Sequence, residues 1–428
     1  AEHFASIKGP APVIMVSGRT FPVEVRYRPF EESRDYDTHD AIADAVDELW
    51  RGGAQAGDVL VFLPGEREIR EAADHLRKHL SHQPALRNAE VLPLYARLSQ
   101  AEQDLIFHPK GQRRIVLATN VAETSLTVPG IRYVVDAGTA RVKRYSLRSK
   151  VEQLLIEPVS QAAANQRAGR CGRVADGICI RLYDESDFNG RARFTDPEIL
   201  RSSLASVILR MKSLHLGDVG SFPFLEAPSS RAITDGYQLL AELGAVDDAL
   251  ELTEVGHALS KLPLDPRVGR MLLAAHEGQA LDEMLVIASA LSVQDVRERP
   301  MESQAQSDQA HAKFDDEKSE FVSWLKLWQW LETSRTGKPP VVAKGKAGGV
   351  PLIQALQAPL GAANQPTNIP NPTQSEHKLS HRQYEALLRQ NFVSVRRVRE
   401  WRDIHTQLVT VVAEHGWLRN TLPASYEQ

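Results

Sequence analysis

Short apolar runs rich in β-branched residues alternate with amphipathic segments over the first half of the chain. One such segment, residues 65–80 (GEREIREAADHLRKHL), has its apolar residues at helical spacing. Strands that alternate with helices predict a parallel α/β sheet covered on both faces, and ligands bind such sheets beyond the carboxyl ends of the strands. We therefore expect chemistry in the loops after Pro64, Thr119 and Gly138. The runs that predict buried strands are VLVFLP (59–64), RRIVLATN (113–120), IRYVVDAG (131–138) and GICIRLY (177–183).

From about Pro197 the apolar residues recur every three or four positions, which predicts helices. We expect a short extended stretch within residues 248–259 (DALELTEVGHAL). Residues 281–292 (LDEMLVIASALS) are apolar nearly all round, which predicts a buried central helix. Residues 333–378 cluster Gly, Pro, Asn and Gln, and their only acidic residue is Glu376, so we expect a flexible insertion there.

Composition places the chain among globular proteins of several domains. At roughly one domain per 150 residues, a chain of 428 residues suggests about two to four domains. No run of about 18 apolar residues and no signal-peptide pattern is found. Cys171 and Cys179 have no metal-ligand pattern around them, so a reducing compartment, the cytoplasm, is expected. The net charge of −4 indicates that any polyanion must be bound by local basic patches.

The most informative basic segment is QRAGRCGR (166–173), in which Arg167, Arg170 and Arg173 recur every third position. Arginines three apart on a helix repel one another unless a polyanion or carboxylates neutralise them. The guanidinium fork suits bidentate contact with phosphate oxygens. A solvated basic helix face with ion pairs is the alternative, but the glycines within the run weaken a purely structural helix. We therefore favour phosphate as the partner.

Four ordered segments resemble the motifs of the DEAH-box RNA helicases, within the P-loop NTPase superfamily. Residues 119–138 (TNVAETSLTVPGIRYVVDAG) and QRAGRCGR resemble motifs V and VI, residues 59–69 (VLVFLPGEREI) resemble motif IV, and residues 92–107 resemble the segment called IVa. Residues 11–29 resemble the entry into the second RecA-like domain of the bacterial HrpA type. The resemblance continues through LPLDPRVGRMLLAA and LRQNFVSVRRVREWRDIHTQL and covers nearly all of the chain except the predicted insertion.

The resemblance implies an α/β RecA-like domain at 1–195 with a β-hairpin at 138–158, a winged-helix domain at 196–263, and a ratchet-like helical bundle at 264–428. Neither a G-x-x-x-x-G-K-[ST] phosphate loop nor an Asp-Glu-Ala-His quartet is present in this sequence. In the family both belong to the first RecA-like domain. We therefore expect the chain to be a fragment that begins just after motif III and ends before the oligonucleotide-binding barrel.

The same resemblance assigns the nucleotide-site residues. Gln166 is expected to orient the attacking water or touch the γ-phosphate, and Arg170 and Arg173 are expected to be arginine fingers. Three further residues are expected to bind the nucleotide: Thr127 near the ribose, Gly169 and Arg167. For Arg167 a supporting ion pair is an open alternative. The family's usual aspartate two residues after Thr127 is here Pro129, so ribose recognition is expected to be looser, and Cys171 is expected to be a small buried residue.

For RNA, the resemblance assigns two strand-end turns and the long hairpin. Thr119, Asn120, Gly65 and Arg67 are expected to contact phosphates without reading sequence. The hairpin is expected to act as a wedge near the point of strand separation, although a merely solubilising hairpin is the alternative. Residues 396–401 (RRVREW) could line a single-strand channel, but we favour helix packing for Trp401, Trp324, Trp328 and Trp330. The hairpin's basic residues are Arg141, Lys143, Arg144, Arg148 and Lys150.

The family's activity is ATP-dependent translocation on and unwinding of RNA, with ATP and Mg²⁺ as cofactors. We expect the intact protein to be a cytoplasmic monomer that binds single-stranded and duplex RNA, and ribosome-associated RNA is plausible for the family. The chain by itself is expected to bind RNA weakly and to hydrolyse ATP negligibly. The rival hypotheses are an inactive helicase-like RNA-binding adaptor and a helical scaffold that acts through the region after residue 300.

Overall fold

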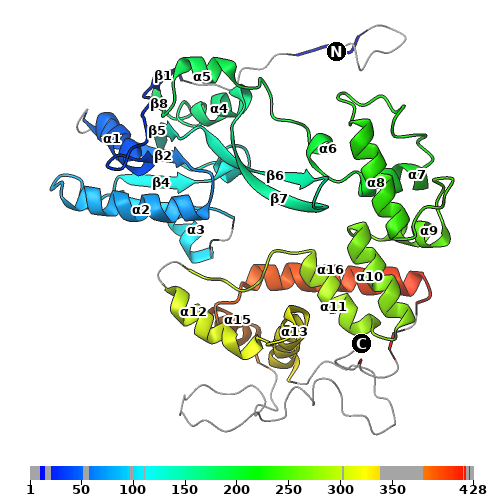
Figure 1. Cartoon of the computed structure of the whole chain (residues 1–428). Coiled ribbons are helices and arrows are strands. Elements are labelled where there is room, and N and C mark those ends of the chain that lie inside the picture. Colours follow the sequence, from blue (N-terminus) through cyan, green and yellow to red (C-terminus); the bar gives the residue numbers. More distant parts are fainter. Residues whose placement is uncertain are drawn as a thin grey trace. The chain divides into compact units, whose positions relative to one another are not determined.

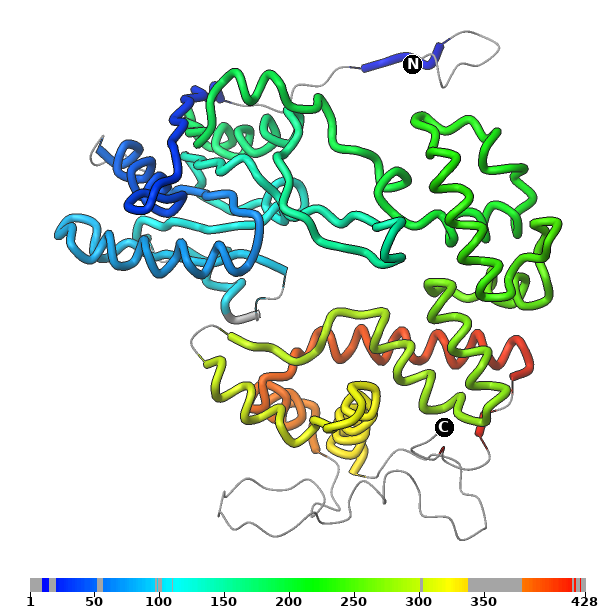
Figure 2. The backbone as a smooth tube through the Cα atoms, in the orientation of Figure 1, coloured from blue at the N-terminus to red at the C-terminus, as the bar shows by residue number. Residues whose placement is uncertain are grey.

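The structure is a computed structural model that describes residues 10–14, 21–51, 57–96, 98, 100–109, 111–300, 303–337, 379–417, 419–420 and 424. The chain divides into two compact units (Figure 1). The first comprises Ala1–Ser203 and Pro223–Ala232, and the second comprises Leu204–Phe222 and Ile233–Gln428. The backbone path of each unit can be followed in Figure 2. In the described part of the chain, no helix is both long and apolar enough to cross a membrane.

A six-stranded parallel sheet forms the centre of the first unit, with strand order β1-β8-β5-β2-β4-β3. The central strands are fully buried because their sequences are continuous apolar runs, as in the segment Ile115–Ala118. The prediction of a parallel α/β sheet is therefore confirmed. The strands are β1 Val23–Tyr27, β2 Asp58–Phe62, β3 Glu90–Leu94, β4 Arg114–Ala118, β5 Ile131–Asp136 and β8 Gly177–Arg181.

Helices cover both faces of this sheet. Parallel crossovers are right-handed, so α1 and α2, which pack on each other, lie on one face, and α3 and α4 lie on the other. The helices of this unit are α1 Thr38–Trp50, α2 Glu66–Ser81, α3 Gln100–Phe107, α4 Gln161–Ala168, α5 Glu185–Gly190 and α6 Glu198–Arg201, with a 3₁₀ turn, η2, at Asn120–Ala122.

A two-stranded antiparallel hairpin, β6 (Thr139–Ser146) and β7 (Val151–Pro158), is inserted between β5 and α4 (Figure 1). Its register pairs Thr139 with Pro158 at the root and Ser146 with Val151 near the turn. The hairpin predicted at 138–158 is therefore present. Its second strand leaves four large apolar side chains exposed: Val151, Leu154, Leu155 and Ile156.

The second unit is helical. α11, the predicted central helix, packs against α10, α13 and α16, and most of its residues are buried. Val246 and Leu252 form an isolated antiparallel bridge, which accounts for the expected extended stretch, but the helix α9 begins at Glu254, earlier than expected. The helices are α7 Ala205–Ser213, α8 Ser230–Glu242, α9 Glu254–Lys261, α10 Pro266–Glu277, α11 Leu281–Leu291, α12 Gln304–His311, α13 Glu320–Thr336, α15 His381–Gln390 and α16 Val395–Glu414, with a 3₁₀ turn, η4, at Ala312–Phe314.

Tryptophans form the centre of the helical bundle. Trp401 is completely buried, and its ring lies 4.8 Å from that of Trp328 and 5.5 Å from that of Trp324. Its Nε1 donates to the Ser289 hydroxyl at 3.0 Å. The partly buried Trp330 packs against the same cluster. The packing role predicted for these residues is confirmed, and Trp401 offers no surface to a nucleic-acid base.

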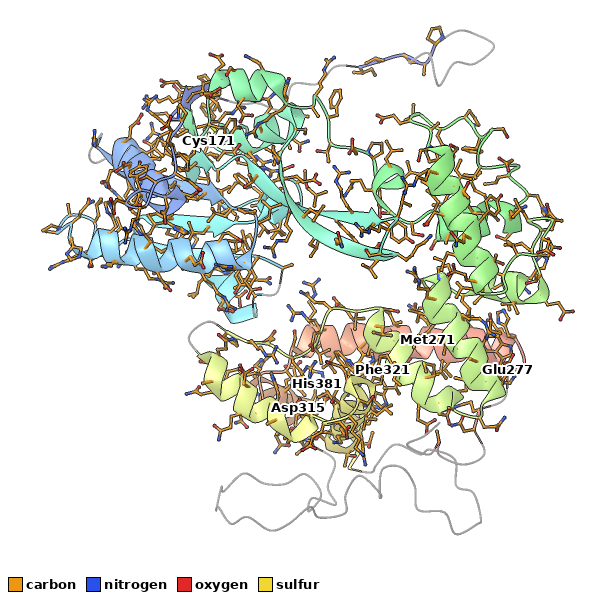
Figure 3. All side chains as sticks on the ribbon, in the orientation of Figure 1. Cys171, Met271, Glu277, Asp315, Phe321 and His381 are labelled. Atoms are coloured by element: carbon orange, nitrogen blue, oxygen red, sulfur yellow. The ribbon has the colours of Figure 1, made fainter. Side chains whose placement is uncertain are left out.

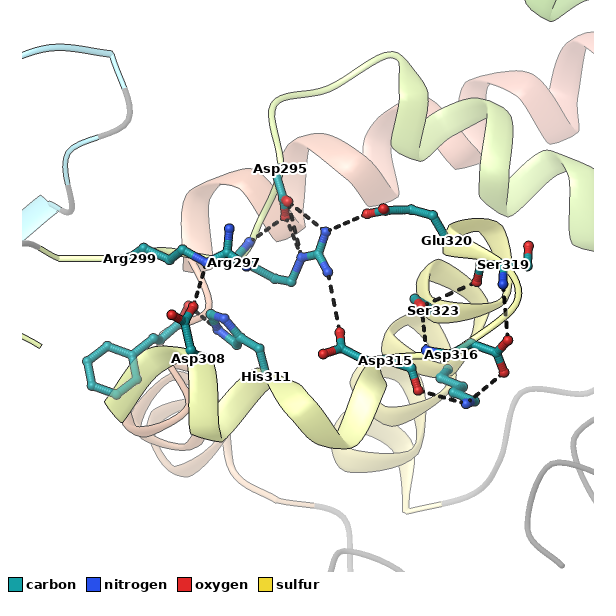
Figure 4. A network of polar contacts seen from close by, with 12 residues as sticks. Asp295, Arg297, Arg299, Asp308, His311, Asp315, Asp316, Ser319, Glu320 and Ser323 are labelled. Atoms are coloured by element: carbon teal, nitrogen blue, oxygen red, sulfur yellow. Dashed lines mark hydrogen bonds and ion pairs between the residues drawn. The ribbon is translucent and has the colours of Figure 1, made fainter. Parts of the chain in front are cut away.

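A polar network next to this cluster connects the segment after α11 to the start of α13 (Figure 4). The Arg297 guanidinium bonds Asp295 at 2.9 Å and Glu320 at 3.0 Å, and it lies over the Trp324 ring. Arg299 pairs with Asp308 at 2.8 Å. Because Arg297 is paired with carboxylates and stacked on an aromatic ring, we interpret this network as a support for the bundle.

The expected insertion at 333–378 begins too early. α13 continues to Thr336, Ser334 is buried, and Gly337 ends the helix in the left-handed conformation with φ 71°. Residues 338–378 lie outside the described residues. The domain boundaries expected after residues 195 and 263 stay predictions.

Candidate nucleotide-binding site

The helix α4 carries the first part of the arginine segment. Ser160 caps its start by accepting from the Ala163 amide at 3.2 Å, and the helix ends at Ala168 because Gly169 follows. Arg170 and Arg173 therefore lie in the turn after the helix and do not share one helical face with Arg167. Gly169 is the C-cap of α4 and is half-buried. The helical-face interpretation of the three arginines is wrong for this reason.

Arg167 is completely buried, and its Nε and Nη1 bond protein groups, whereas its Nη2 has no hydrogen-bond partner in the part of the chain that the structure describes. Its Nη1 lies 2.7 Å from Asp136 Oδ1, and its Nε lies 3.1 Å from Glu123 Oε2. Its guanidinium also lies over the Phe62 ring. Burial by itself lowers the pKa of Arg167, but the two carboxylates outweigh burial and hold the pKa above its usual value. The structure favours the supporting ion pair and leaves no surface for a nucleotide, which corrects the prediction of Arg167 as a nucleotide-binding residue.

Arg170 and Arg173, unlike Arg167, are not fully buried. Arg173, which is exposed, donates from Nη1 to Thr127 Oγ1 at 2.7 Å, and the half-buried Arg170 donates to the Leu126 carbonyl at 3.4 Å. Within the described residues, neither guanidinium forms an ion pair with a carboxylate. Burial lowers the pKa of Arg170, the charge of Arg173 lowers it further, and Glu123 partly opposes both effects. Two neighbouring, unneutralised guanidinium groups favour the binding of an anion.

The fold thus brings together three residues predicted from two separate motifs: Thr127 from one, and Arg170 and Arg173 from the other. Thr127 lies in the loop after Thr119, where chemistry was expected. Arg170 and Arg173 lie outside the expected loops, because residues 169–176 follow α4 and precede the amino end of β8. The amide of Phe21 donates to the Gly172 carbonyl at 3.2 Å next to that strand end. α4 extends along β5 and positions the turn beside the Leu126–Thr127 segment.

The remaining residues of the segment divide between surface and core. Gln166 is exposed at the last turn of α4. Its neighbour Asn165 accepts from the buried Arg181 of β8 at 2.9 Å, and this bond fixes α4 to the sheet. Cys171, which is labelled in Figure 3, is completely buried. Its thiol donates to the Ala168 carbonyl at 3.0 Å. The prediction of Cys171 as a small buried residue is confirmed.

Sequence reasoning missed the carboxylates Asp136 and Glu123. Asp136 ends β5, in which it follows the apolar residues Val134 and Val135, and it has no exposed surface. A charged residue within an apolar strand needs an ionic partner, so this position was a detectable signal. In the described residues, no group of three or more His, Cys, Asp or Glu side chains is arranged to hold a metal ion.

The predicted RNA-contact residues from two turns lie at one edge of the sheet. β2 and β4 are parallel neighbours that pair Phe62 with Ala118, so the turn with Gly65 adjoins the turn with Thr119 and Asn120. Arg67 is exposed and pairs with Glu71 at 2.9 Å. Arg141 of the hairpin reaches this edge: a Cβ added to Gly65 would lie 3.0 Å from the Arg141 Cζ, and Arg141 pairs with Glu68 at 3.6 Å.

The positive charge of the hairpin is largely neutralised within the protein. Lys143 pairs with Glu152, and Arg144 pairs with Glu157 and with Asp196. Arg148 is exposed at the turn, where Lys150 adopts the left-handed conformation with φ 57°. The strongly basic hairpin expected from the sequence is therefore a hairpin of ion pairs with a basic turn.

Three segments of the chain match families of helicase domains. Residues 41–175 match the family described as "Helicase conserved C-terminal domain". Residues 237–264 match the winged-helix part of the helicase associated domain HA2, and residues 265–327 match its ratchet-like part. The winged-helix and helical regions predicted from the sequence are confirmed by these matches.

Curated relatives align over the whole chain. The ATP-dependent RNA helicase HrpA of Escherichia coli (strain K12) is 49% identical over 435 residues, which cover 100% of this chain and 30% of that protein. A homologue of HrpA from Haemophilus influenzae is 47% identical over 434 residues, with the same coverage. This chain thus spans about 30% of the length of these relatives.

Two solved structures of the E. coli helicase HrpB are also similar. The structure described as a DExH-box NTPase has a TM-score of 0.58 and 35% identity, and covers 66% of this chain and 34% of that chain. The structure described as a DEAH/RHA helicase has a TM-score of 0.60 and 32% identity, and covers 74% of this chain and 38% of that chain. With whole-chain identity near one half, matching helicase domains and a shared fold, this chain belongs to the HrpA-type DEAH-box RNA helicases.

Proposed function

We propose that this chain supplies the arginine side of a composite ATP site in an RNA helicase. The observation that carries the proposal is the Arg173–Thr127 hydrogen bond of 2.7 Å, with the half-buried Arg170 beside it and, among the described residues, no carboxylate paired with either arginine. Arg170 and Arg173 would stabilise the charge that develops on the transferred phosphoryl group, and Gln166 would orient the attacking water. Gly169 would let the nucleotide approach the backbone.

The arginine pair fits phosphate, but a phosphate cradle must come from another RecA-like domain. The 428 residues of this chain contain no G-x-x-x-x-G-K-[ST] loop. When bound with ATP, Mg²⁺ neutralises the phosphate oxygens and would be held mainly by that other domain. The chain's own contribution is a pair of guanidinium groups, of which that of Arg173 bonds Thr127 and that of Arg170 bonds the Leu126 carbonyl.

RNA is the proposed substrate because both curated relatives are RNA helicases. Gly65, Arg67, Thr119 and Asn120 lie at two neighbouring turns, and they would hold RNA phosphates without reading sequence. Arg141, Lys143, Arg144, Arg148 and Lys150 are proposed as RNA contacts of the hairpin, which would separate strands as ATP hydrolysis drives translocation. The intact protein would work as a monomer in the cytoplasm.

The test is ATP hydrolysis by the full-length protein with RNA. We expect Arg173→Ala or Arg170→Ala to lower kcat by about 10³-fold, as for other arginine fingers. Thr127→Val keeps the shape of the side chain but removes the acceptor of the Arg173 bond, so we expect a loss of about tenfold. The double variant Thr127→Val with Arg173→Ala should lower kcat no more than Arg173→Ala by itself, because Thr127 acts through that arginine.

The exposed Arg87 gives a matched control, since Arg87→Ala removes an arginine from the same unit and should leave ATP hydrolysis unchanged. Equal activity of wild-type, Arg170→Ala and Arg173→Ala proteins would refute the composite site. A full-length protein that binds RNA but never hydrolyses ATP would support the adaptor, and RNA crosslinks confined to residues after 380 would support the scaffold.

The chain 1–428 by itself provides a second test. We expect it to bind RNA weakly and to hydrolyse ATP negligibly, because a phosphate loop is not part of its sequence. Robust RNA-stimulated ATP hydrolysis by purified 1–428 would contradict the proposal.

A further inference from the structure

The root of the β6–β7 hairpin is held by a buried carboxylate. Asp136, the last residue of β5, accepts three hydrogen bonds: from Arg167 Nη1 at 2.7 Å, from the Gly138 amide at 2.9 Å and from the Tyr183 hydroxyl at 3.0 Å. Burial and the Asp136 carboxylate raise the pKa of Tyr183, so the hydroxyl stays protonated and donates. One carboxylate thus joins α4, the end of β8 and the turn that starts the hairpin.

α4 is bonded directly to the first residue of the hairpin. The same Nη1 of Arg167 that contacts Asp136 also donates to the Thr139 carbonyl at 3.1 Å. Arg167 follows Gln166 and lies three positions before Arg170 in the proposed nucleotide segment. A displacement of that segment would therefore reach Thr139 through a side chain that has no contact with water.

A second arginine holds the root from α5. Arg191, the C-cap of that helix, donates from Nη1 to the Gly138 carbonyl at 2.8 Å and to the Val159 carbonyl at 3.4 Å. Val159 follows β7 and donates its amide to the same Gly138 carbonyl at 2.9 Å. The Arg191 guanidinium lies 3.8 Å above the centre of the Tyr183 ring. Both strands of the hairpin are therefore fixed at their base by one stacked Arg–Tyr pair.

The outer half of the hairpin is held differently. Its charged side chains pair mainly across the two strands, and Val151 and Leu154 are at least half exposed. A hairpin of this kind can apply force at its tip only if its base does not bend. The stiffness must come from the root, where the contacts are buried.

We propose that Tyr183 and Arg191 are positioning residues that couple the state of the nucleotide segment to the movement of the hairpin. The inference rests on the proposed function, because it assigns these residues to the coupling step of the helicase and not to ATP hydrolysis. Neither residue would touch ATP or RNA. Tyr183 keeps Asp136 aligned between Arg167 and Gly138, and Arg191 keeps the two strand ends together at Gly138 and Val159.

The experiment measures, in one reaction of the full-length protein, base pairs of duplex RNA unwound and ATP molecules hydrolysed. Tyr183→Phe removes only the hydroxyl that bonds Asp136. Tyr133→Phe is the matched control: Tyr133 lies on β5 like Asp136, is buried to 8% exposure compared with 7% for Tyr183, and is absent from the root contacts. Arg191→Gln removes the guanidinium that bonds the Gly138 and Val159 carbonyls, and it leaves the hydrogen bonds of Asp136 in place.

We expect Tyr183→Phe and Arg191→Gln to lower the number of base pairs unwound per ATP by at least about fivefold, while RNA-stimulated ATP hydrolysis stays within about twofold of wild type. Tyr133→Phe should change neither quantity. A merely structural role would lower both activities together and leave their ratio unchanged, which would overturn the inference. A ratio in Tyr183→Phe equal to that in Tyr133→Phe would overturn it as well. If the wild-type protein hydrolyses no ATP with RNA, the proposed function itself fails, so the two failures are distinguishable.

Discussion

Arg167 and Asp136 form an ion pair of 2.7 Å in which neither side chain has any exposed surface. The pair lies between the helix that carries the proposed catalytic glutamine and the turn that starts the hairpin. Glu123 completes a cluster of one arginine and two carboxylates. Burial raises the pKa of Glu123, the charge of Asp136 also raises it, and the charge of Arg167 opposes both effects.

The first prediction concerns the stability of this cluster. Arg167→Ala leaves two carboxylates without their counter-ion, and we expect it to lower the free energy of unfolding of the first unit by about 3–5 kcal/mol. Urea denaturation of the chain 1–428, followed by circular dichroism, measures the loss. Arg173→Ala is the control, because that side chain is exposed and removing it should change the stability by less than about 0.5 kcal/mol. Equal effects of the two substitutions would show that Arg167 is not a structural ion pair.

The second prediction separates hairpin arginines that differ in their partners. Arg148 is exposed at the turn, whereas Arg144 is paired with Glu157 and Asp196. We expect Arg148→Ala to reduce the slope of log affinity against log salt for RNA binding by about 1, as for the loss of one phosphate contact. Arg144→Ala should reduce that slope less than Arg148→Ala, because Glu157 and Asp196 already neutralise most of the Arg144 charge. Filter binding by the full-length protein at several salt concentrations measures both, and the reverse order of effects would rule out the turn as an RNA contact.

The third prediction concerns Gly138, between β5 and the hairpin. Its φ is 78°, and an added Cβ would lie 2.5 Å from Cδ1 of Tyr183. Gly111 has a similar φ of 85°, but an added Cβ there would meet no atom within 4 Å. Gly111→Ala should therefore destabilise by about 1 kcal/mol through backbone strain, and Gly138→Ala by at least about 2 kcal/mol more through the clash. Thermal unfolding of 1–428 compares the two variants, and indistinguishable melting temperatures would contradict the close packing of Tyr183 on Gly138.

The fourth prediction is a pH dependence of the helical bundle. The pKa of His405 is lowered from its usual 6.5 to about 4, mainly by burial and also by the charge of Arg419, whereas Glu332 and Asp282 oppose the shift. The folded bundle therefore favours neutral His405. As the pH falls from about 6.5 to about 4, the unfolded chain takes up a proton that the folded chain does not, so stability is lost within that window and unaffected above it.

The loss attributable to His405 is up to about 3 kcal/mol, since one pKa unit corresponds to about 1.4 kcal/mol. Tryptophan fluorescence in urea can follow this loss, because the centre of the Trp328 ring lies 4.7 Å from that of the His405 ring. His405→Gln should flatten the pH dependence, whereas substitution of the exposed His257 by Gln should not. An unchanged pH dependence in His405→Gln would refute the assignment.

The sequence by itself determined the fold class, the hairpin, the buried central helix and the family. The fold class and the elements follow from local patterns, because the spacing of apolar residues indicates strands and helices. The family follows from motifs, because a motif places fixed residue types at fixed spacing. The buried Cys171 and the tryptophan core were also predictable, since such side chains are stable when packed.

Only the tertiary structure decided which of the three arginines forms a buried ion pair and which are left without a carboxylate partner among the described residues. Arg167, Arg170 and Arg173 are equivalent in the sequence, but Arg167 is paired with carboxylates 31 and 44 positions away, and Arg173 is bonded to a threonine 46 positions away. The same holds for the hairpin, in which acids of the opposite strand pair with Lys143 and Arg144. The free energy of a charged group depends on its burial and on the charges that the fold places around it, and neither quantity is a property of local sequence.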